Sequence, residues 1–476
     1  MAGAGQAKYR PYPAYKPSGV EWLGDIPEWW ETASLRWFSE IFSGGTPSKT
    51  VPEYWENGTI PWLNSGAVNQ VEITKASKYI SKTALNNSSA KWVPKNALVL
   101  ALAGQGRTKG MVAFTKIATT CNQSMAAIVP HERKDTKFYF WWVNSCYDKI
   151  RNLAGGDLRD GLNLELLGSI PCPIPTLPEQ TKIAAFLDHE TAKIDGLIAK
   201  QQRLIALLEE KRQAVISHAV TKGLDPTAPL RPSGIDWLGD VPEHWEVKRL
   251  KHIASIFGRI GFRGYTVDDI VDEGEGAIVL SPSNVKDERF SLEKRSYVSW
   301  EKYYESPEIV VSAGDLLLVK TGSTFGKSTF VRTVDEPMTI NPQMALIKID
   351  KKWAEFVSFF LRTALIKATI EVNNTGSGMP TMTQENLGRF PILLAPNDET
   401  NQIVEYLNRK SEIFDVLVAK AQSAVTLLKE RRTALISAAV TGKIDLRDWQ
   451  APEGASDISN QDHSIKDITQ NEEALA

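Results

Sequence analysis

The sequence predicts an α+β protein, with two tandem mixed-sheet domains and two long helices that form an antiparallel coiled coil in a pseudo-two-fold arrangement. Two repeats carry this prediction. The segment Lys16–Trp30 returns 215 residues later at Arg231–Trp245, and the segment Ala199–Thr221 returns 220 residues later at Ala419–Thr441. Repeats this far apart indicate a duplicated domain, because the period of a solenoid would be roughly 20–50 residues.

Length and composition fit a protein of several domains in a reducing compartment. The 476 residues exceed the roughly 250–300 at which a single core stops growing. The three cysteines, Cys121, Cys146 and Cys172, fit neither a disulfide framework nor a metal knuckle, because they are odd in number and widely spaced. No signal-peptide pattern and no run of ~18 apolar residues occurs. We therefore expect a cytoplasmic protein.

The repeats also place the domain boundaries. We expect a globular block at 1–176, a long helix at 177–226, a second block at 227–394, a second helix at 395–447 and a mobile tail at 448–476. Lys and Arg outnumber Asp and Glu by 19 to 14 in the first block, whereas the tail has 1 basic and 7 acidic residues. The second block, with 20 basic and 22 acidic residues, gives no electrostatic support for nucleic-acid binding.

A helical pattern runs from Leu177 to Lys222, with apolar residues at alternating three- and four-residue steps. Pro178 marks its start and Gly223 its end. The pattern returns in the second copy and ends at Gly442. The expected helix–helix seam includes Ile194, Leu197, Leu204, Leu208, Val215, Phe414, Leu417, Leu428 and Leu435.

A lone amphipathic helix of about 65 Å would leave much of its apolar stripe in water, so we expect the two helices to pack together. The alternative is that each helix caps only its own block. Antiparallel packing follows from the connectivity, because it places one block at each end of the pair. Lys211 and Arg431 fall on the seam, where a polar residue either fixes the register or extends its charge to solvent.

The Pro-Ser-Gly-x-x-Trp-Leu-Gly-x-x-Pro-x-x-Trp segment follows the first helix at 232–245, yet its first copy stands near the start of the chain at 17–30. Under the expected symmetry, the first copy should lie beside the end of the second helix, near Thr441. Clustered tryptophans with Pro and Gly favour a packing plug, and base stacking is the alternative function.

The two globular blocks are diverged but share a common order of elements. Apolar runs at 97–103, 277–280, 316–319 and 344–349 predict strands, and 138–150 and 353–372 predict helices. Leu167–Pro171 matches Leu387–Pro391 at the same offset as the helices. Two domains that recognise different half-sites would show this pattern, in which the order of elements is kept and the sequence between them diverges.

No catalytic or metal-binding residues are predicted. Gly322–Ser328 resembles a phosphate loop, but Thr321 stands where the first glycine is required. Asn341–Met344 resembles part of an amino-methyltransferase loop but lacks its second proline and its aromatic residue. Its counterpart Asn122–Met125 indicates a repeated structural turn. The six histidines are scattered, without metal-ligand spacing.

Polar loops suited to base edges and phosphates occur in both blocks. Arg and Lys pair with guanine, Asn and Gln with adenine, and Ser, Thr and backbone amides with phosphate. The candidates in the first block are Gly45, Thr46, Ser48, Lys49, Asn64, Ser65, Gln105, Arg107, Lys109 and Arg159. Those in the second block are Arg259, Arg263, Ser283, Asn284, Lys320, Thr321, Ser323 and Thr324.

The order block, helix, block, helix, with the helix-end segments Leu208–Gly223 and Leu428–Asp445, resembles the specificity subunit of Type I restriction-modification systems. The resemblance covers residues ~16–447. It implies that the blocks are target-recognition domains, the helices are spacers, and the partners are double-stranded DNA, two modification (methyltransferase) subunits and two restriction (motor nuclease) subunits. It also implies that S-adenosylmethionine, ATP and magnesium bind to those partners and not to this chain.

We therefore expect a non-catalytic reader of a bipartite, asymmetric DNA site, with one recognition domain for each half. Two alternatives remain open at this stage. The chain could be a duplicated coiled-coil scaffold without DNA contact, or an enzyme with an unfamiliar site.

Overall fold

The computed structural model describes residues 9–104, 106–131, 134–153, 162–259, 264–286, 289–363, 366 and 381–452. The chain divides into two compact units. Unit 1 comprises residues 1–200 and 424–476, and unit 2 comprises residues 201–423. Each unit therefore contains a globular block and one half of each long helix, α5 (Leu177–Lys222) and α10 (Asn397–Val440).

The block of unit 1 is built on two mixed sheets. The first has the order β4-β12-β9-β10-β6, with β4 (Ser39–Ser43), β12 (Met125–Pro130), β9 (Leu98–Ala101), β10 (Val112–Thr115) and β6 (Glu72–Ile73). The second has the order β7-β5-β11-β8, with β7 (Lys78–Ile80), β5 (Ile60–Leu63), β11 (Thr119–Cys121) and β8 (Trp92–Val93). The β10–β6 and β11–β5 pairs are parallel, and the others are antiparallel.

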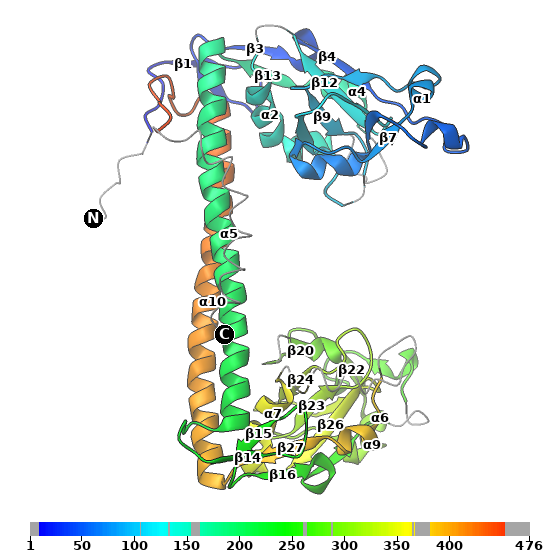
Figure 1. Ribbon diagram of the computed structural model, residues 1–476, viewed down its shortest axis with the longest axis vertical. Helices are drawn as coiled ribbons and strands as arrows, with labels where there is room; N and C mark the ends of the chain where they lie inside the picture. The colour runs from blue at the N-terminus through cyan, green and yellow to red at the C-terminus, as the bar shows by residue number, and fades with distance from the viewer. Residues whose placement is uncertain are drawn as a thin grey trace. The chain divides into compact units, whose positions relative to one another are not determined.

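Strand β9 shows why the first sheet forms at the centre of unit 1. All four of its residues are buried, and alternate side chains enter different apolar clusters. Leu98 and Leu100 pack with α2 (Thr136–Ser145), whereas Val99 and Ala101 pack on the other face with Met125. Helix α2 fills the space between this sheet and α5 (Figure 1).

Unit 2 repeats the arrangement with two four-stranded sheets. One has the order β17-β26-β23-β24, with β17 (Ala254–Phe257), β26 (Met344–Ile349), β23 (Leu316–Val319) and β24 (Ser328–Phe330). The other has the order β18-β22-β19-β25, with β18 (Ile270–Val271), β22 (Tyr297–Ser299), β19 (Gly276–Leu280) and β25 (Met338–Ile340). The burial of β23 alternates like that of β9, because Leu316 and Leu318 enter one cluster and Leu317 and Val319 the other.

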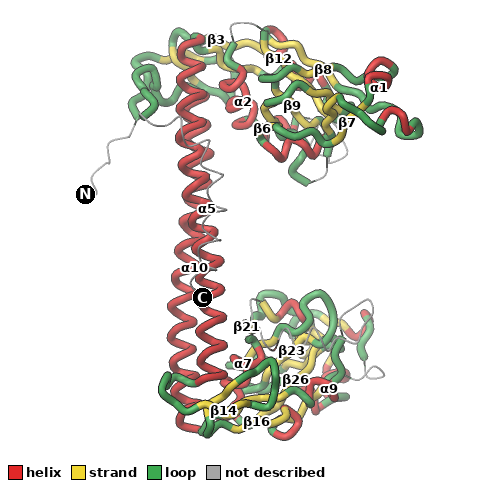
Figure 2. Tube along the Cα trace, in the orientation of Figure 1, coloured by secondary structure: helices red, strands yellow, loops and turns green. Residues whose placement is uncertain are grey.

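Shorter elements complete the blocks (Figure 2). In unit 1 they are β1 (Tyr15–Pro17), β2 (Asp25–Pro27), β3 (Glu31–Ser34), α1 (Lys82–Asn86), α3 (Tyr147–Asn152), α4 (Leu164–Gly168) and β13 (Pro171–Ile174). In unit 2 they are β14 (Leu230–Pro232), β15 (Asp240–Pro242), β16 (Glu246–Arg249), β20 (Val285–Lys286), β21 (Arg289–Phe290), α6 (Trp300–Tyr304), α7 (Lys351–Leu361), α9 (Gln384–Gly388) and β27 (Pro391–Leu394).

The four predicted strands are confirmed as β9, β19, β23 and β26, and the α+β class is confirmed with them. The helix predicted at 138–150 is interrupted, because α2 ends at Ser145 and α3 begins at Tyr147. The helix predicted at 353–372 begins earlier, at Lys351, and α7 ends at Leu361. Most of the predicted range beyond Leu361 lies outside the described residues.

Within each unit, the two helix halves run antiparallel. In unit 1, Arg432 Nε donates to Asp195 Oδ1 at 2.9 Å, and Lys182 Nζ donates to the Arg447 carbonyl. In unit 2, Arg212 Nη2 donates to the Ser411 carbonyl at 3.2 Å, and a Cβ built on Gly223 would lie 2.8 Å from Glu399 Oε1. Later residues of α5 therefore meet earlier residues of α10 in both units.

The buried face of the helices corrects part of the predicted seam. Ile194 and Phe414 are buried, but Leu197, Leu204 and Leu417 are 47%, 44% and 42% exposed, so their prediction is wrong. Leu208, Val215, Leu428 and Leu435 are half-buried. Ile216 and Ile436, each one residue beyond a predicted seam position, enter the cores of their units instead. The physical reason is that each helix end turns its apolar face toward a block as well as toward the other helix.

Two arginines, each one residue after a predicted polar seam position, form the ion pairs that join the two helices. Lys211 and Arg431 are exposed. Arg212 forms an ion pair with Asp415 in unit 2, and Arg432 with Asp195 in unit 1. The two pairs are related by the 220-residue repeat, so the same cross-helix contact occurs once in each unit.

A double-mutant cycle on Arg432 and Asp195 should give a coupling free energy of about 0.5–1 kcal/mol, because the pair is partly exposed. The measurement is the free energy of urea unfolding of the two single variants and the double variant. Arg431→Ala is the matched control, since its side chain is exposed beside the pair. Coupling within error of zero would show that the ion pair does not hold the register.

Candidate nucleic-acid interface

Each block is attached to the helices through one of the repeated tryptophan segments. Trp30 is fully buried, and its Nε1 donates to Glu179 Oε1 at 3.3 Å; Trp29 Nε1 donates to the same atom at 3.2 Å. In unit 2, Trp245 Nε1 donates to Glu399 Oε2 at 3.0 Å. Both carboxylates stand in the first turn of a long helix, where the helix dipole favours negative charge. The packing interpretation is thereby confirmed for Trp30 and Trp245, whereas Trp22 and Trp29 are 40% and 38% exposed.

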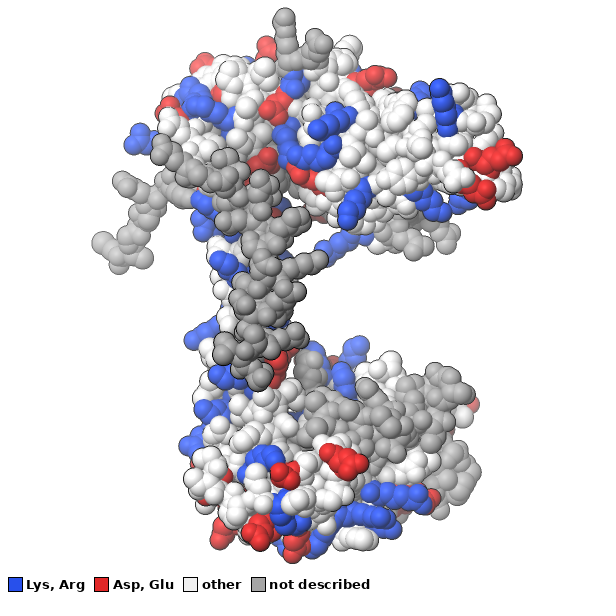
Figure 3. Space-filling model, in the orientation of Figure 1, with Lys and Arg blue, Asp and Glu red and all other residues white. Residues whose placement is uncertain are grey.

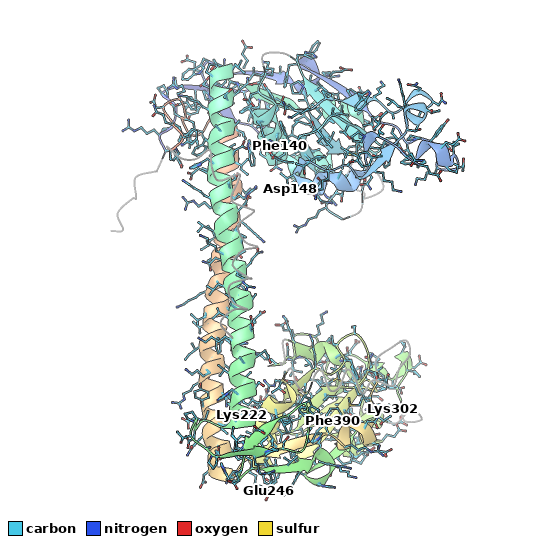
Figure 4. The ribbon with its side chains drawn as sticks, in the orientation of Figure 1. Phe140, Asp148, Lys222, Glu246, Lys302 and Phe390 are labelled. Carbon is cyan, nitrogen blue, oxygen red and sulfur yellow. The ribbon has the colours of Figure 1, made fainter. Side chains whose placement is uncertain are left out.

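The first tryptophan segment lies beside the end of α10, as predicted. Tyr15 Oη donates to the Gly442 carbonyl at 3.1 Å, and the Asp445 amide donates to the Arg10 carbonyl at 2.7 Å. In unit 2, Lys222 at the end of α5 donates from Nζ to the Asp240 carbonyl at 2.5 Å (Figure 4). We call each junction of a tryptophan segment, one helix start and one helix end a root.

Several predicted contact residues of unit 1 lie on exposed loops. Lys49, Asn64 and Arg107 are exposed. Thr46 Oγ1 donates to Gln123 Oε1, which brings the 44–49 loop against the turn before β12. Ser48, also exposed, and half-buried Ser65 complete this group. Gly45 is buried, with its amide 2.8 Å from the Cys121 carbonyl, and so supports the loop instead of presenting it.

Three predicted contact residues are buried and are corrected to structural supports. Lys109 is 3% exposed, and its carbonyl accepts a hydrogen bond from Arg151 Nη1 at 3.3 Å. Arg259 is 3% exposed and donates to the Ile340 carbonyl. Asn284 is 2% exposed, because its side chain closes the turn after β19. Sequence composition does not separate a polar residue that closes a loop from one that offers its side chain to a ligand.

In unit 2, Ser283 and Ser323 are exposed, and Lys320, Thr321 and Thr324 are half-buried on the loop after β23. The structure places two further polar side chains beside this loop that the sequence prediction missed, Gln343 and Gln384. The repeated turn at 341–344 was the available signal for Gln343. Gln105, Arg159 and Arg263 lie outside the described residues.

Charges of both signs are interspersed over each unit on the face shown in Figure 3, in keeping with the net charge of −2. Among the described residues, no group of three His, Cys, Asp or Glu side chains could hold a metal ion. No helix in the described part of the chain combines the length and apolarity that a membrane crossing requires.

Comparisons with known proteins agree with this architecture. Residues 27–206 match the family model of the Type I restriction modification DNA specificity domain. The EcoR124I/EcoR124II specificity subunit of Escherichia coli is 31% identical over 204 residues, which cover 42% of this chain and 47% of that protein. The MjaVIII specificity subunit of Methanocaldococcus jannaschii is 20% identical over 427 residues, covering 89% of this chain and 94% of that protein.

A solved chain from a study of complex assembly and conformational transition of the type I R-M system has the same fold, with a TM-score of 0.67 at 17% identity. The match covers 88% of this chain and 99% of that one. Residues 27–206 are thus similar to the DNA-specificity class of domains. Over most of its length the chain is similar to specificity subunits of Type I restriction-modification systems.

Proposed function

We propose that this chain is the non-catalytic reader of a bipartite, asymmetric DNA site, with one half read by each block. The observation that supports it most is that the two units keep the same root and sheet frame but carry different polar residues on it. The Glu179 and Glu399 roots are equivalent, whereas the position of Leu102 after β9 is taken by Lys320 after β23. Two domains that keep the same backbone arrangement but differ in the side chains at equivalent positions are suited to recognise different DNA sequences.

The exposed apolar residues of the helices support docking of partner subunits. Leu197 and Leu417 are equivalent under the repeat and are 47% and 42% exposed, and Leu207 and Leu427 are 44% and 64% exposed. Soluble helices rarely leave such residues uncovered in series. We assign this surface to two modification subunits, one for each copy, with two restriction subunits completing the complex. S-adenosylmethionine, ATP and magnesium would then bind to those partners and not to this chain. The complex would act in the cytoplasm.

The helices would set the distance between the two half-sites. Inserting four residues into both α5 and α10 should lengthen the unread gap by about two base pairs, since four helical residues span ~6 Å and a base-pair step spans ~3.4 Å. The insertion should leave both half-site sequences unchanged. Mapping of methylated sites in cells that carry the variant complex measures the gap directly.

A matched control inserts the same four residues after Asp448, beyond α10. This change should leave the gap as it is. A methylation pattern with an unaltered gap in the helix-insertion complex would refute the spacer role, because the reading blocks would then be positioned by another part of the assembly.

A scaffold without DNA contact is the second candidate, favoured by the near-neutral charge. A mobility-shift assay on modification subunits with and without this chain separates the two functions. A reader should confer sequence-specific binding that falls steeply as salt rises, because phosphate contacts release counterions. Binding that is independent of this chain would favour the scaffold.

A further inference from the structure

Two polar side chains of unit 2, those of Lys320 and Gln384, lie close together near the end of β23, and the side chain of Gln343 lies beside the loop that follows this strand. A Cβ atom built on Gly258 would lie 3.0 Å from Lys320 Nζ and 2.5 Å from Gln384 Nε2, so both groups stand over the same glycine. On the adjoining loop, a Cβ built on Gly322 would lie 3.6 Å from Gln343 Nε2. The backbone holds these segments together, because the Lys320 amide donates to the Gln343 carbonyl at 2.8 Å and its own carbonyl accepts from Met382.

Lys320 is half-buried, and no counter-charge lies beside it among the described residues. Within the residues that the structure describes, its Nζ has neither a salt bridge nor a hydrogen bond, whereas Lys348 in the same sheet pairs with Asp315 at 2.8 Å. Burial alone lowers the pKa of Lys320. A cation in this setting gains from any ligand that supplies an acceptor oxygen or nitrogen.

The surrounding residues fix the positions of these groups. Buried Arg259 donates to the Ile340 carbonyl and to Thr339 Oγ1, both at 3.0 Å, and so braces the turn that carries Gln343. At that turn, Asn341 Oδ1 accepts from the backbone N–H of Gln343 at 3.0 Å, and Asn341 Nδ2 donates to the side-chain oxygen Gln343 Oε1 at 3.3 Å. Gln343 and Gln384 are themselves exposed. The amides are therefore presented to solvent from a supported base.

Unit 1 has different chemistry at the equivalent positions. Strand pairing aligns Ala101 and Met125 with Val319 and Met344, so that Leu102 corresponds to Lys320 and Ser124 to Gln343. Gly168 approaches the side chain of Ile41 as Gly388 approaches that of Ile256, so these two pairs are equivalent. Counting four residues back from each glycine aligns Leu164 with Gln384. Counting three residues on from each isoleucine aligns Gly44 with Arg259. Unit 2 thus has a lysine, two amides and a bracing arginine where unit 1 has two leucines, a serine and a glycine.

We infer that Lys320, Gln343 and Gln384 read purine edges in the half-site bound by unit 2. Lysine donates to guanine O6 and N7, and a glutamine amide pairs with adenine N6 and N7, which matches the donors and acceptors of this cluster. The inference rests on the proposed function, because it names the bases that one block would recognise. Arg259 is a positioning residue and does not touch the DNA.

The test replaces Lys320 by the residue that unit 1 carries. A complex with Lys320→Leu should lose preference for guanine at one position of one half-site, on the order of 10-fold or more, because a specific contact to a base edge is lost. The other half-site should stay unchanged. The readout is the methylation motif of the assembled modification complex, mapped on random-sequence DNA.

Two further variants keep the test independent of folding. Gln384→Leu alters an exposed side chain and should relax an adenine in the same half-site. Lys302→Leu on α6 is the matched control, since this lysine lies on the side of the block away from the helices (Figure 4) and should leave the motif intact.

The outcomes separate the inference from the proposed function. Uniformly weaker methylation with an unchanged motif in both Lys320→Leu and Gln384→Leu would overturn the inference, because phosphate contacts carry no sequence information. The bipartite motif itself would still stand in that case. The proposed function would instead be overturned by a different result. In that case the methylation motif of the wild-type complex would stay the same after this chain was replaced by another specificity subunit.

Discussion

Trp30→Ala is expected to destabilise unit 1 by about 3–5 kcal/mol and to leave unit 2 folded. The Trp30 ring is fully buried in the apolar cluster that joins the sheet, α5 and the end of α10, and its Nε1 donates to Glu179. The substitution removes the ring and one of the donors to a carboxylate. Since Trp30 touches the first turn of one helix and the end of the other, its loss loosens the whole root.

The three cysteines allow this effect to be measured on unit 1 alone, because all of them lie in that unit and are buried. Burial raises the pKa of Cys121 to about 12 and that of Cys146 to about 11, and it raises the pKa of Cys172 as well. The thiolate is the reactive form, so folded thiols should react slowly at pH 8, and unfolding should release them. In Trp30→Ala, labelling by a disulfide reagent should begin at a lower urea concentration.

Trp245→Ala is the matched control, because the equivalent tryptophan lies in unit 2. It should lower the stability of unit 2 by a similar amount with little change in thiol labelling. Equal labelling of the two variants would contradict the separation into two units, since it would mean that damage at one root unfolds the entire chain.

Gly442→Ala is expected to destabilise unit 1 by about 2–5 kcal/mol. Gly442 lies just beyond the end of α10 and has a φ of +71°, a left-handed conformation that costs a residue with a side chain roughly 1–2 kcal/mol. The added methyl group would also lie 2.6 Å from Pro27 Cγ and 3.1 Å from Trp30 Cη2. Overpacking against these rings adds about 1–3 kcal/mol. Thermal unfolding followed by calorimetry measures the sum.

Gly24→Ala separates the two contributions. Gly24 has a similar φ of +67°, but nothing lies within 4 Å of the position that its Cβ would take. This variant should show the backbone cost alone, about 1–2 kcal/mol. If Gly442→Ala and Gly24→Ala lowered the unfolding temperature equally, the tight approach of α10 to the first tryptophan segment would be contradicted.

The long elements could be predicted from sequence, because their patterns are periodic and their ends are marked. The range of α5 and the buried strands β9 and β23 follow from spacing alone. The position of the first tryptophan segment also followed, since the repeat fixed its environment in advance. These predictions depend only on the spacing of apolar residues and on the offset between the two copies of the repeat. They do not require knowing in which direction a side chain points.

The details of exposure could not be predicted in the same way. Leu197 and Ile216 are both apolar residues of one helix, yet the first is exposed and the second is buried because a block covers only part of each helix face. Arg259 and Lys320 are both basic residues at strand ends, but among the described residues only the first has carbonyl acceptors inside the fold. Which residue meets a partner depends on packing between segments that are distant in sequence.

The composition of the unit 1 core has a consequence for synthesis on the ribosome. Its apolar cluster includes Ile436, Ala439, Val440 and Leu446 together with Trp30. Domains usually fold in the order in which they are translated. Here the block of unit 1, which precedes unit 2 along the chain, cannot complete its apolar cluster until residues 436–446 have been translated, whereas unit 2 can finish earlier. The nascent chain must therefore carry an open apolar surface while unit 2 is translated, and a ribosome that stalls before Ile436 would release a protein prone to aggregate.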